Sequence, residues 1–241
     1  MIKERYHVTI SRWTAGRYLK RWGFTPRKPA KRALEQNPEA VMHWLDTEYP
    51  AIKKAPDKEQ AEIHWGDEMG IRSDHQSGRT WGIKGKTPIV SSTGQRFSCH
   101  MISTITNRGT LRFMIFQKRF TTEVFIEFLR RLVRSVKHKV YLIVDNHSVH
   151  RAARVRKWLE RHDDKIVVFY LPPYSPEPNP EECLNNDIKN NASQTRRLNS
   201  KKELQENVRY YLRVTQKRPA IVRRFFRGQR SLIPHEMSTI K

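Results

Sequence analysis

The chain has 241 residues and carries 47 Lys and Arg against 24 Asp and Glu, a formal net charge of +23. Because the excess is spread along the whole chain, the folded body should present a positive field; nucleic acid is the first partner to consider, ahead of a ribosome or a membrane surface. No stretch approaches the roughly 18 consecutive apolar residues of a membrane span, and two cysteines, Cys99 and Cys183, make neither a disulfide framework nor a zinc pattern. We therefore expect a soluble intracellular protein without structural zinc.

The first 32 residues predict one helix and a linker. Ser11 can cap a helix over 9–24 and Gly23 can supply its left-handed C-terminal residue. One face is apolar and the opposite face carries the basic residues Arg12, Arg17, Lys20 and Arg21. Two interpretations are equally weighted: the last helix of a helix-turn-helix lying on DNA, or an ordinary surface helix with a solvated basic face. The Pro-rich basic stretch that follows, which includes Arg27 and Lys28, is the best domain boundary in the chain.

Residues 33–60 predict a helical connector between this segment and the main domain. Asn37 is a capping residue, Pro38 suits the first helical position, and Glu39 places an acid in the first turn. We expect Pro50 to break or redirect the helix.

The main domain, 61–215, predicts an α/β fold built on a mixed sheet. Strand-like runs over 61–67, 80–90, 96–105 and 111–116 together predict an antiparallel meander of three strands. A helix over 121–136 leads into two further apolar runs that form a parallel β-α-β unit. The sheet then has three antiparallel strands plus two parallel strands, flanked by helices. Lys84 and Lys86 would suit a hairpin that faces DNA, although a solvated hairpin is more common.

The C-terminal part of this domain begins with a stiff loop. Five prolines between 172 and 180 exclude both helix and ladder pairing, and a helix should start at Asn179. Ser200 and Glu203 form a capping box for a later helix. Residues 216–241 are expected to be a basic tail close to DNA or solvent.

Three acids fall at positions where a metal site can form. Asp67 lies on the first strand, Asp145 ends the fourth, and Glu182 follows the proline loop. Neighbouring central strands would place the two aspartates side by side, and the loop could bring Glu182 to them. Clustered carboxylates repel one another unless cations lie between them, and hard oxygen ligands suit Mg²⁺ or Mn²⁺, not zinc. Two such ions are suited to phosphodiester chemistry.

Each of these residues also has a plainer interpretation. Glu182 could be the acid of an N-terminal cap, and Asp67 a strand-end acid with Glu68 as its solvated neighbour. The residues around the proposed site, Glu68, Asn146, His147 and His150, are expected to support the ligands rather than to bind metal, because three carboxylates already supply a hard site. Phosphate contact or packing at a helix start remain open for the two histidines.

Three segments resemble the acidic motifs of the DDE transposases of the mariner superfamily, most nearly the bacterial insertion-sequence six-thirty family. They are Trp65-Gly-Asp67-Glu68, Val144-Asp145-Asn146-His147 and Leu171-Pro-Pro-Tyr-Ser-Pro-Glu-Pro-Asn-Pro-Glu-Glu182. The last is the most specific, and the resemblance extends over roughly residues 9 to 215 by motif order.

The resemblance implies an RNase H-like catalytic domain in which Asp67, Asp145 and Glu182 hold two Mg²⁺ or Mn²⁺ ions, with 36 residues between the last two acids. It implies nicking at transposon ends and attack of the freed 3′ hydroxyl on target DNA. The expected partners are double-stranded DNA, as terminal inverted repeats and target, and a second copy in a homodimer on DNA. The expected location is the bacterial cytoplasm, at the nucleoid.

One departure from the family pattern lies at the N-terminus. Family members resemble a chain with paired helix-turn-helix units, and only the final helix is present here, so we expect a remnant helix-turn-helix in a shortened copy. Two other functions stay open: an RNase H-like metal-dependent endonuclease without joining activity, and an inactive DNA-binding remnant.

Overall fold

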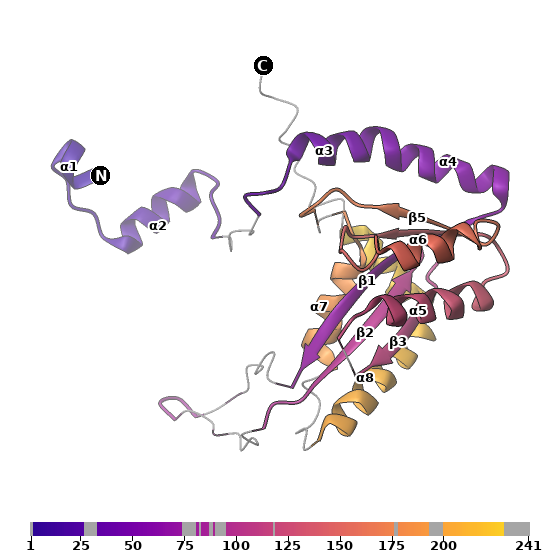
Figure 1. The fold of residues 1–241 in the computed structure, drawn as a ribbon. Coiled ribbons are helices and arrows are strands. Elements are labelled where there is room, and N and C mark those ends of the chain that lie inside the picture. Colours follow the sequence, from indigo (N-terminus) through magenta and orange to yellow (C-terminus); the bar gives the residue numbers. More distant parts are fainter. Residues whose placement is uncertain are drawn as a thin grey trace. The chain divides into compact units, whose positions relative to one another are not determined.

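The computed structural model describes residues 2–26, 33–73, 81, 83–86, 89, 95–117, 119–175, 178–192 and 200–228. The chain divides into two compact units, Met1–Leu34 and Glu35–Lys241. Figure 1 shows their elements along the chain. Arg27 and Lys28, expected to contact DNA, lie outside the described residues.

The first unit contains α1 (Ile2–Tyr6) and α2 (Arg12–Arg21). The predicted caps of α2 are confirmed: the Ser11 side chain accepts a hydrogen bond from the backbone N–H of Thr14, and Gly23 has φ +83°. Gly23 and Phe24 donate their N–H groups back to the last turn of the helix. No residue of α2 is buried, so its apolar and basic faces are both exposed.

The helical segment that follows has three parts: α3 (Pro38–His43), a π-helical turn η1 (Trp44–Glu48) and α4 (Tyr49–Glu59). The Asn37 side chain caps α3 as predicted. The expected break at Pro50 is wrong, because the wider π turn precedes Pro50 and the helix continues through it. Trp44 stacks on Tyr49 and meets Trp65 edge-on, which packs this segment against the first strand.

The sheet confirms the predicted α/β class. Its strands are β1 (Glu62–Arg72), β2 (Ser98–Ile105), β3 (Leu111–Phe116), β4 (Val140–Val144) and β5 (Ile166–Tyr170), in the order β3-β2-β1-β4-β5. The first three pair antiparallel, and β4 is parallel to both β1 and β5. The predicted strand over 80–90 is not seen in its described residues, which include a turn at Lys84 and Gly85. Instead, β1 runs five residues beyond its predicted end, to Arg72.

Helices cover both faces of the sheet (Figure 1). On one face lie α5 (Thr122–Ser135) and α6 (Ala153–Glu160), whose apolar residues form a core with Leu142 and Val144. The other face packs against α7 (Glu181–Asn191), α8 (Lys201–Gln216) and α9 (Pro219–Gly228) through Trp65 and Ile143. Every second residue of a strand faces the same way, so β4 contributes Leu142 and Val144 to one core and Ile143 to the other.

The described part of the expected C-terminal tail is structured. Residues 219–228 form α9, and Val222 on this helix is fully buried. Gly109, in the turn between β2 and β3, has φ +93° and lies against Pro219 at the start of α9. The segment is therefore part of the domain and not a tail.

Among the described residues, no helix combines the length and the apolar character that crossing a membrane requires.

Candidate active site

Strand alternation places two aspartates on the face of the sheet that α7 covers. In β1, Trp65 and Met69 are buried in the core beneath α7. Asp67 lies two residues from each of them, at a position that faces the same side of the sheet. In β4, Ile143 belongs to the same core and Asp145 follows two residues later. Because side chains of a strand alternate, both aspartates point toward this face.

The pairing register brings the two aspartates together. The neighbouring parallel strands β1 and β4 pair Trp65 with Ile143, and each aspartate comes two residues after its paired position. Asp67 and Asp145 are therefore carried by adjacent strands at the same level of the sheet.

The start of α7 supplies the third acid. Glu182 is in the first turn of this helix, directly after the proline loop. A cavity of about 530 Å³ is lined by all three acids together with neighbouring loop residues: Asp67, Asp145, Asn146, His147, Ser148, Leu171, Pro172, Pro173, Tyr174, Ser175, Asn179 and Glu182. Three predicted carboxylates from three separate elements thus open into one hollow.

The carboxylates of this cavity repel one another. Burial, followed by the charges of Glu68, Glu182 and Asp145, raises the pKa of Asp67 well above its ordinary value. Burial also raises the pKa of Glu182, with Asp145 adding to the increase and Lys189 opposing it. Each pair among Asp67, Asp145 and Glu182 is therefore close enough for one negative charge to oppose the ionisation of the other.

Asp145 remains the most acidic of the three. Burial acts to raise its pKa, but hydrogen bonds and charge from His150 and His147 outweigh that effect and lower it. His150 Nδ1 lies 3.0 Å from Asp145 Oδ1, and the backbone N–H of His147 donates to the same oxygen at 3.1 Å. Asp145 is accordingly the carboxylate best prepared to hold a cation at neutral pH.

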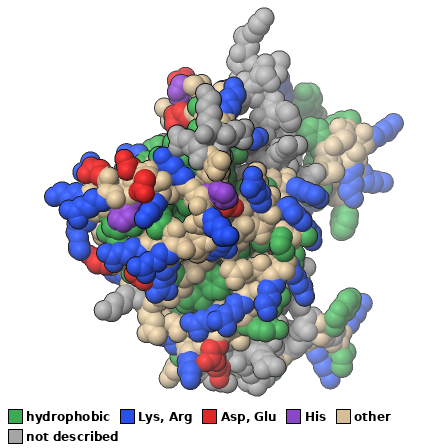
Figure 2. Space-filling view, turned by 90° about the vertical axis from the view of Figure 1, so that its right-hand side faces the viewer, with side chains coloured by type: hydrophobic (Ala, Val, Ile, Leu, Met, Phe, Trp, Pro, Cys, Tyr) green, Lys and Arg blue, Asp and Glu red, His purple; other side chains and the backbone are tan. Residues whose placement is uncertain are grey.

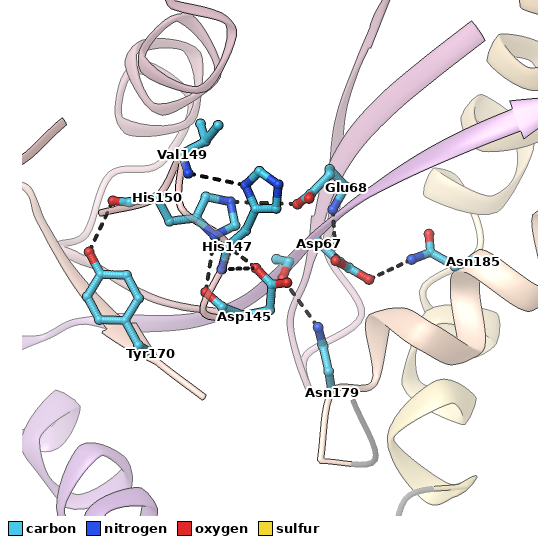
Figure 3. A network of polar contacts seen from close by, with 10 residues as sticks. Asp67, Glu68, Asp145, His147, Val149, His150, Tyr170, Asn179 and Asn185 are labelled. Atoms are coloured by element: carbon cyan, nitrogen blue, oxygen red, sulfur yellow. Dashed lines mark hydrogen bonds and ion pairs between the residues drawn. The ribbon is translucent and has the colours of Figure 1, made fainter. Parts of the chain in front are cut away.

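Glu68 lies on the opposite face of β1 and meets His150 there (Figure 3). One ligand atom from each of Glu68, Asp145 and His150 falls within 4.8 Å of the other two. His150 is fully buried, with Nδ1 toward Asp145 and Nε2 3.6 Å from Glu68 Oε2. A ring that bridges two carboxylates in this way fixes the orientation of Asp145.

The remaining predicted residues fall into three groups. Asn146 and His147 line the cavity, and Asn146 Oδ1 is buried without a hydrogen-bond partner among the described residues. Lys84 and Lys86 are exposed beside a turn, outside the sheet. The four basic residues of α2, Arg12, Arg17, Lys20 and Arg21, are exposed in the first unit.

Three further polar residues in or beside the cavity wall were not predicted from the sequence. Asn185 on α7 donates from Nδ2 to Asp67 Oδ2 at 2.8 Å, and Asn179 donates to the backbone carbonyl of Gly66 at 3.3 Å. Glu181 is fully buried and accepts a hydrogen bond from Ser103 at 3.0 Å; burial, then Asp67, raises its pKa well above the ordinary value. Helical spacing could have placed Asn185 on the face of Glu181 and Glu182, because residues three and four apart are neighbours.

The donor chemistry of the cavity fits divalent cations. Three carboxylates converge there, and the buried Asn146 Oδ1 offers a fourth oxygen. Hard oxygen donors are the ligands that Mg²⁺ and Mn²⁺ prefer, and a cation would relieve the repulsion that raises the pKa of Asp67.

The family follows from comparison with known proteins. A family model described as DDE superfamily endonuclease matches residues 62–205, more than half of the chain. A second model, described as winged helix-turn helix, matches residues 1–48. The chain belongs to the DDE superfamily endonucleases.

Within this family the chain is similar to transposases. It is 25% identical over 215 residues to the insertion element IS630 uncharacterized 39 kDa protein of Shigella sonnei, covering 88% of this chain and 61% of the relative. Solved structures of the Mos1 strand transfer complex and of the mariner Mos1 paired end complex with Mg share its fold, at TM-scores of 0.66 and 0.67 and identities of 18% and 17%. Each match covers 96% of this chain, and 69% and 70% of the respective Mos1 chains. The expected RNase H-like fold and family are thereby confirmed.

Proposed function

We propose that the chain is a DNA transposase that nicks DNA at the ends of its element and joins the freed 3′ hydroxyl to target DNA. The observation that carries the proposal is the convergence of Asp67, Asp145 and Glu182 on one cavity from two strands and a helix. Their mutual repulsion, the match to the DDE endonuclease family and the similarity to an insertion-element protein support it. The chain spans about 61% of the length of that relative.

In this proposal the three carboxylates hold two Mg²⁺ or Mn²⁺ ions. When bound, such ions supply an activated water or hydroxyl and offset negative charge at a phosphodiester. His150 fixes Asp145, and Asn185 fixes Asp67, so both aspartates are oriented before an ion arrives. His147 and Asn146 line the cavity beside them, where they would contact the phosphate or the ion.

DNA binding is proposed for eight basic residues. Those of α2 would contact the terminal inverted repeats, in line with the match of residues 1–48 to a winged helix-turn helix model. Arg27, Lys28, Lys84 and Lys86 are candidates for backbone contacts. Two copies would act together on the paired ends, at the nucleoid of a bacterial cell.

The decisive experiment incubates the purified chain with a supercoiled plasmid that carries the element's inverted repeats, with Mg²⁺ or Mn²⁺. We expect nicked and joined products that require the ion. Asp145→Asn and Glu182→Gln should each abolish both products while circular dichroism shows a folded protein. Retained cleavage in either variant would overturn the assignment of the site.

Glu181→Gln is the matched control for Glu182→Gln. It makes the same chemical change one residue earlier in α7, at a side chain that is buried against Ser103 and does not line the cavity. Most of the activity should survive in this variant. Equal loss in both glutamine variants, with both proteins folded, would contradict a ligand role specific to Glu182.

The same assay separates the two other functions. Ion-dependent nicking without joined products would indicate an endonuclease, which the description of the matched family also covers. DNA binding without either product would indicate an inactive remnant. We expect joining because of the similarity to insertion-element and transposase chains.

A further inference from the structure

A basic groove lies between α5 and α6, on the sheet face opposite to α7. It has a volume of about 320 Å³ and is lined by Glu123, Ile126, Arg130, Arg154, Lys157, Trp158 and Arg161. Apart from the apolar Ile126 and Trp158, the lining holds four cations and one carboxylate. None of these residues lines the cavity that contains Asp67, Asp145 and Glu182. The groove is therefore a second feature of the surface.

Two of the four cations have no anionic partner within the part of the chain that the structure describes. Arg154 pairs with Glu123, and Arg130 lies 3.9 Å from Glu127. Lys157 and Arg161 make no ion pair there and are exposed. Figure 2 looks onto the side of the molecule where α5 lies, and Lys and Arg side chains are spread over it. The groove thus has positive charge available for an external anion.

The spacing of the cations fits a nucleic acid backbone. Arg154, Lys157 and Arg161 follow one another at intervals of three and four residues, so they form a stripe along one side of α6. The stripe is about 10 Å long at the usual helical rise. Along a duplex, the phosphates of one strand are spaced by ~3.4 Å of axis, so roughly three phosphates of one strand lie within that length.

We propose that this groove binds the phosphate backbone of double-stranded DNA, without regard to its sequence, as a contact separate from the catalytic cavity. Lys157 and Arg161 carry the binding, because both are free of internal ion pairs among the described residues. Contacts to phosphates position a duplex and carry no sequence information, which is what capture of variable target DNA requires. The inference rests on the proposed function for its biological meaning, but the binding itself does not depend on catalysis.

The test measures DNA affinity in the full chain with Asp145→Asn as background, so that no DNA is cut. The probes are a random-sequence duplex and a duplex that carries the element's end, titrated by fluorescence anisotropy over a series of salt concentrations. Adding Lys157→Glu and Arg161→Glu should lower the slope of log affinity against log salt by about two, since each phosphate contact contributes ~0.9. Affinity for both duplexes should fall roughly tenfold or more at moderate salt.

The matched control is Arg209→Glu with Arg213→Glu on α8, two exposed residues on a helix that packs against the other sheet face. It changes the net charge by the same amount. The proposal predicts a much smaller effect for this pair than for the groove pair. An unchanged slope in the groove variant, an equal loss in the control, or a loss confined to the end-bearing duplex would each overturn it. Lys157→Gln with Arg161→Gln, which removes charge without reversing it, should reproduce the loss of slope.

Discussion

Asn185 Nδ2 lies 2.8 Å from Asp67 Oδ2 and donates a hydrogen bond across 118 residues of sequence. It ties α7, which carries Glu182, to β1, which carries Asp67 (Figure 3). The other oxygen of Asp67 accepts the backbone N–H of Glu68 at 2.9 Å. Asp67 is thus held at both oxygens before any cation binds.

Asn185→Ala should weaken ion binding more than it weakens the fold. Removing a partner that orients a metal ligand typically costs about 10- to 100-fold in affinity or activity. Cleavage measured against Mn²⁺ concentration should therefore show a higher half-saturating concentration, with the maximal rate recovered in part at high ion. Asn186→Ala, at the exposed neighbouring position, serves as the control. Identical ion dependence in both variants would contradict a role for Asn185.

The raised pKa of Asp67 predicts how the stability of the metal-free protein depends on pH. A carboxyl whose pKa is higher in the folded chain binds its proton more tightly there, so the fold loses stability as pH rises from the ordinary value of 3.8 through the folded value. In a chelator, the melting temperature should be lower at about pH 7.5 than at about pH 4.5, just above the ordinary value. Asp67→Asn should remove much of this difference, and an unchanged difference would contradict the assignment.

Divalent ions should reverse that loss. At an ion concentration of about 100 times the dissociation constant, binding adds roughly 2.7 kcal/mol, which is about 5–10 °C for a domain of this size. The increase should be larger at the higher pH, because ions compete with protons for Asp67 and Glu182. A melting temperature that Mn²⁺ leaves unchanged at both pH values would argue against an ion site in this cavity.

His150→Ala should raise the pKa of Asp145. The ring contributes a hydrogen bond and a favourable charge that, with His147, overcome the effect of burial. Without it, the acid limb of the pH profile of cleavage should move to higher pH. His162→Ala is the control, since that ring stacks on Trp158 and does not line the cavity. A shift of the same size in both variants would show that the effect is not specific to Asp145.

Gly109→Ala should destabilise the domain strongly. The added Cβ would lie 2.5 Å from the backbone oxygen of Pro219, at a residue with φ +93°. Gly85 has φ +83° and no atom of a described residue within 4 Å of its Cβ position, so Gly85→Ala reports the cost of the backbone conformation, about 1–2 kcal/mol. Denaturant unfolding should show a larger loss for Gly109→Ala. Equal losses would mean that the turn and α9 move apart without cost.

The sheet and the three acids could be predicted because their signals are local or alternate regularly. The apolar runs of β4 and β5 and the helix predicted over 121–136 each correspond to an observed element. In that helix Phe125 and Leu129, four residues apart, are both buried in the core.

The wrong or missing predictions fall where packing against other parts of the domain decides the local structure. Pro50 did not end its helix, because a π turn and the packing of Trp44 on Trp65 maintain it. Residues 186–191 are polar except for Ile188, yet they continue α7, because Leu184 and Ile188 anchor the helix in the core. The hydrogen bond from Asn185 to Asp67 depends on how α7 docks on the sheet, which local sequence does not specify.

The pairing of Trp65 with Ile143 has a consequence for which length changes the protein can tolerate. Adding or deleting a single residue inside β1 before Asp67 would turn this carboxylate to the opposite side of the sheet. Glu182 lies on α7, which a separate loop connects to β5. The length of that loop is therefore less constrained than the length of β1. Natural variants with altered spacing should therefore concentrate in the connecting loops and spare the two central strands.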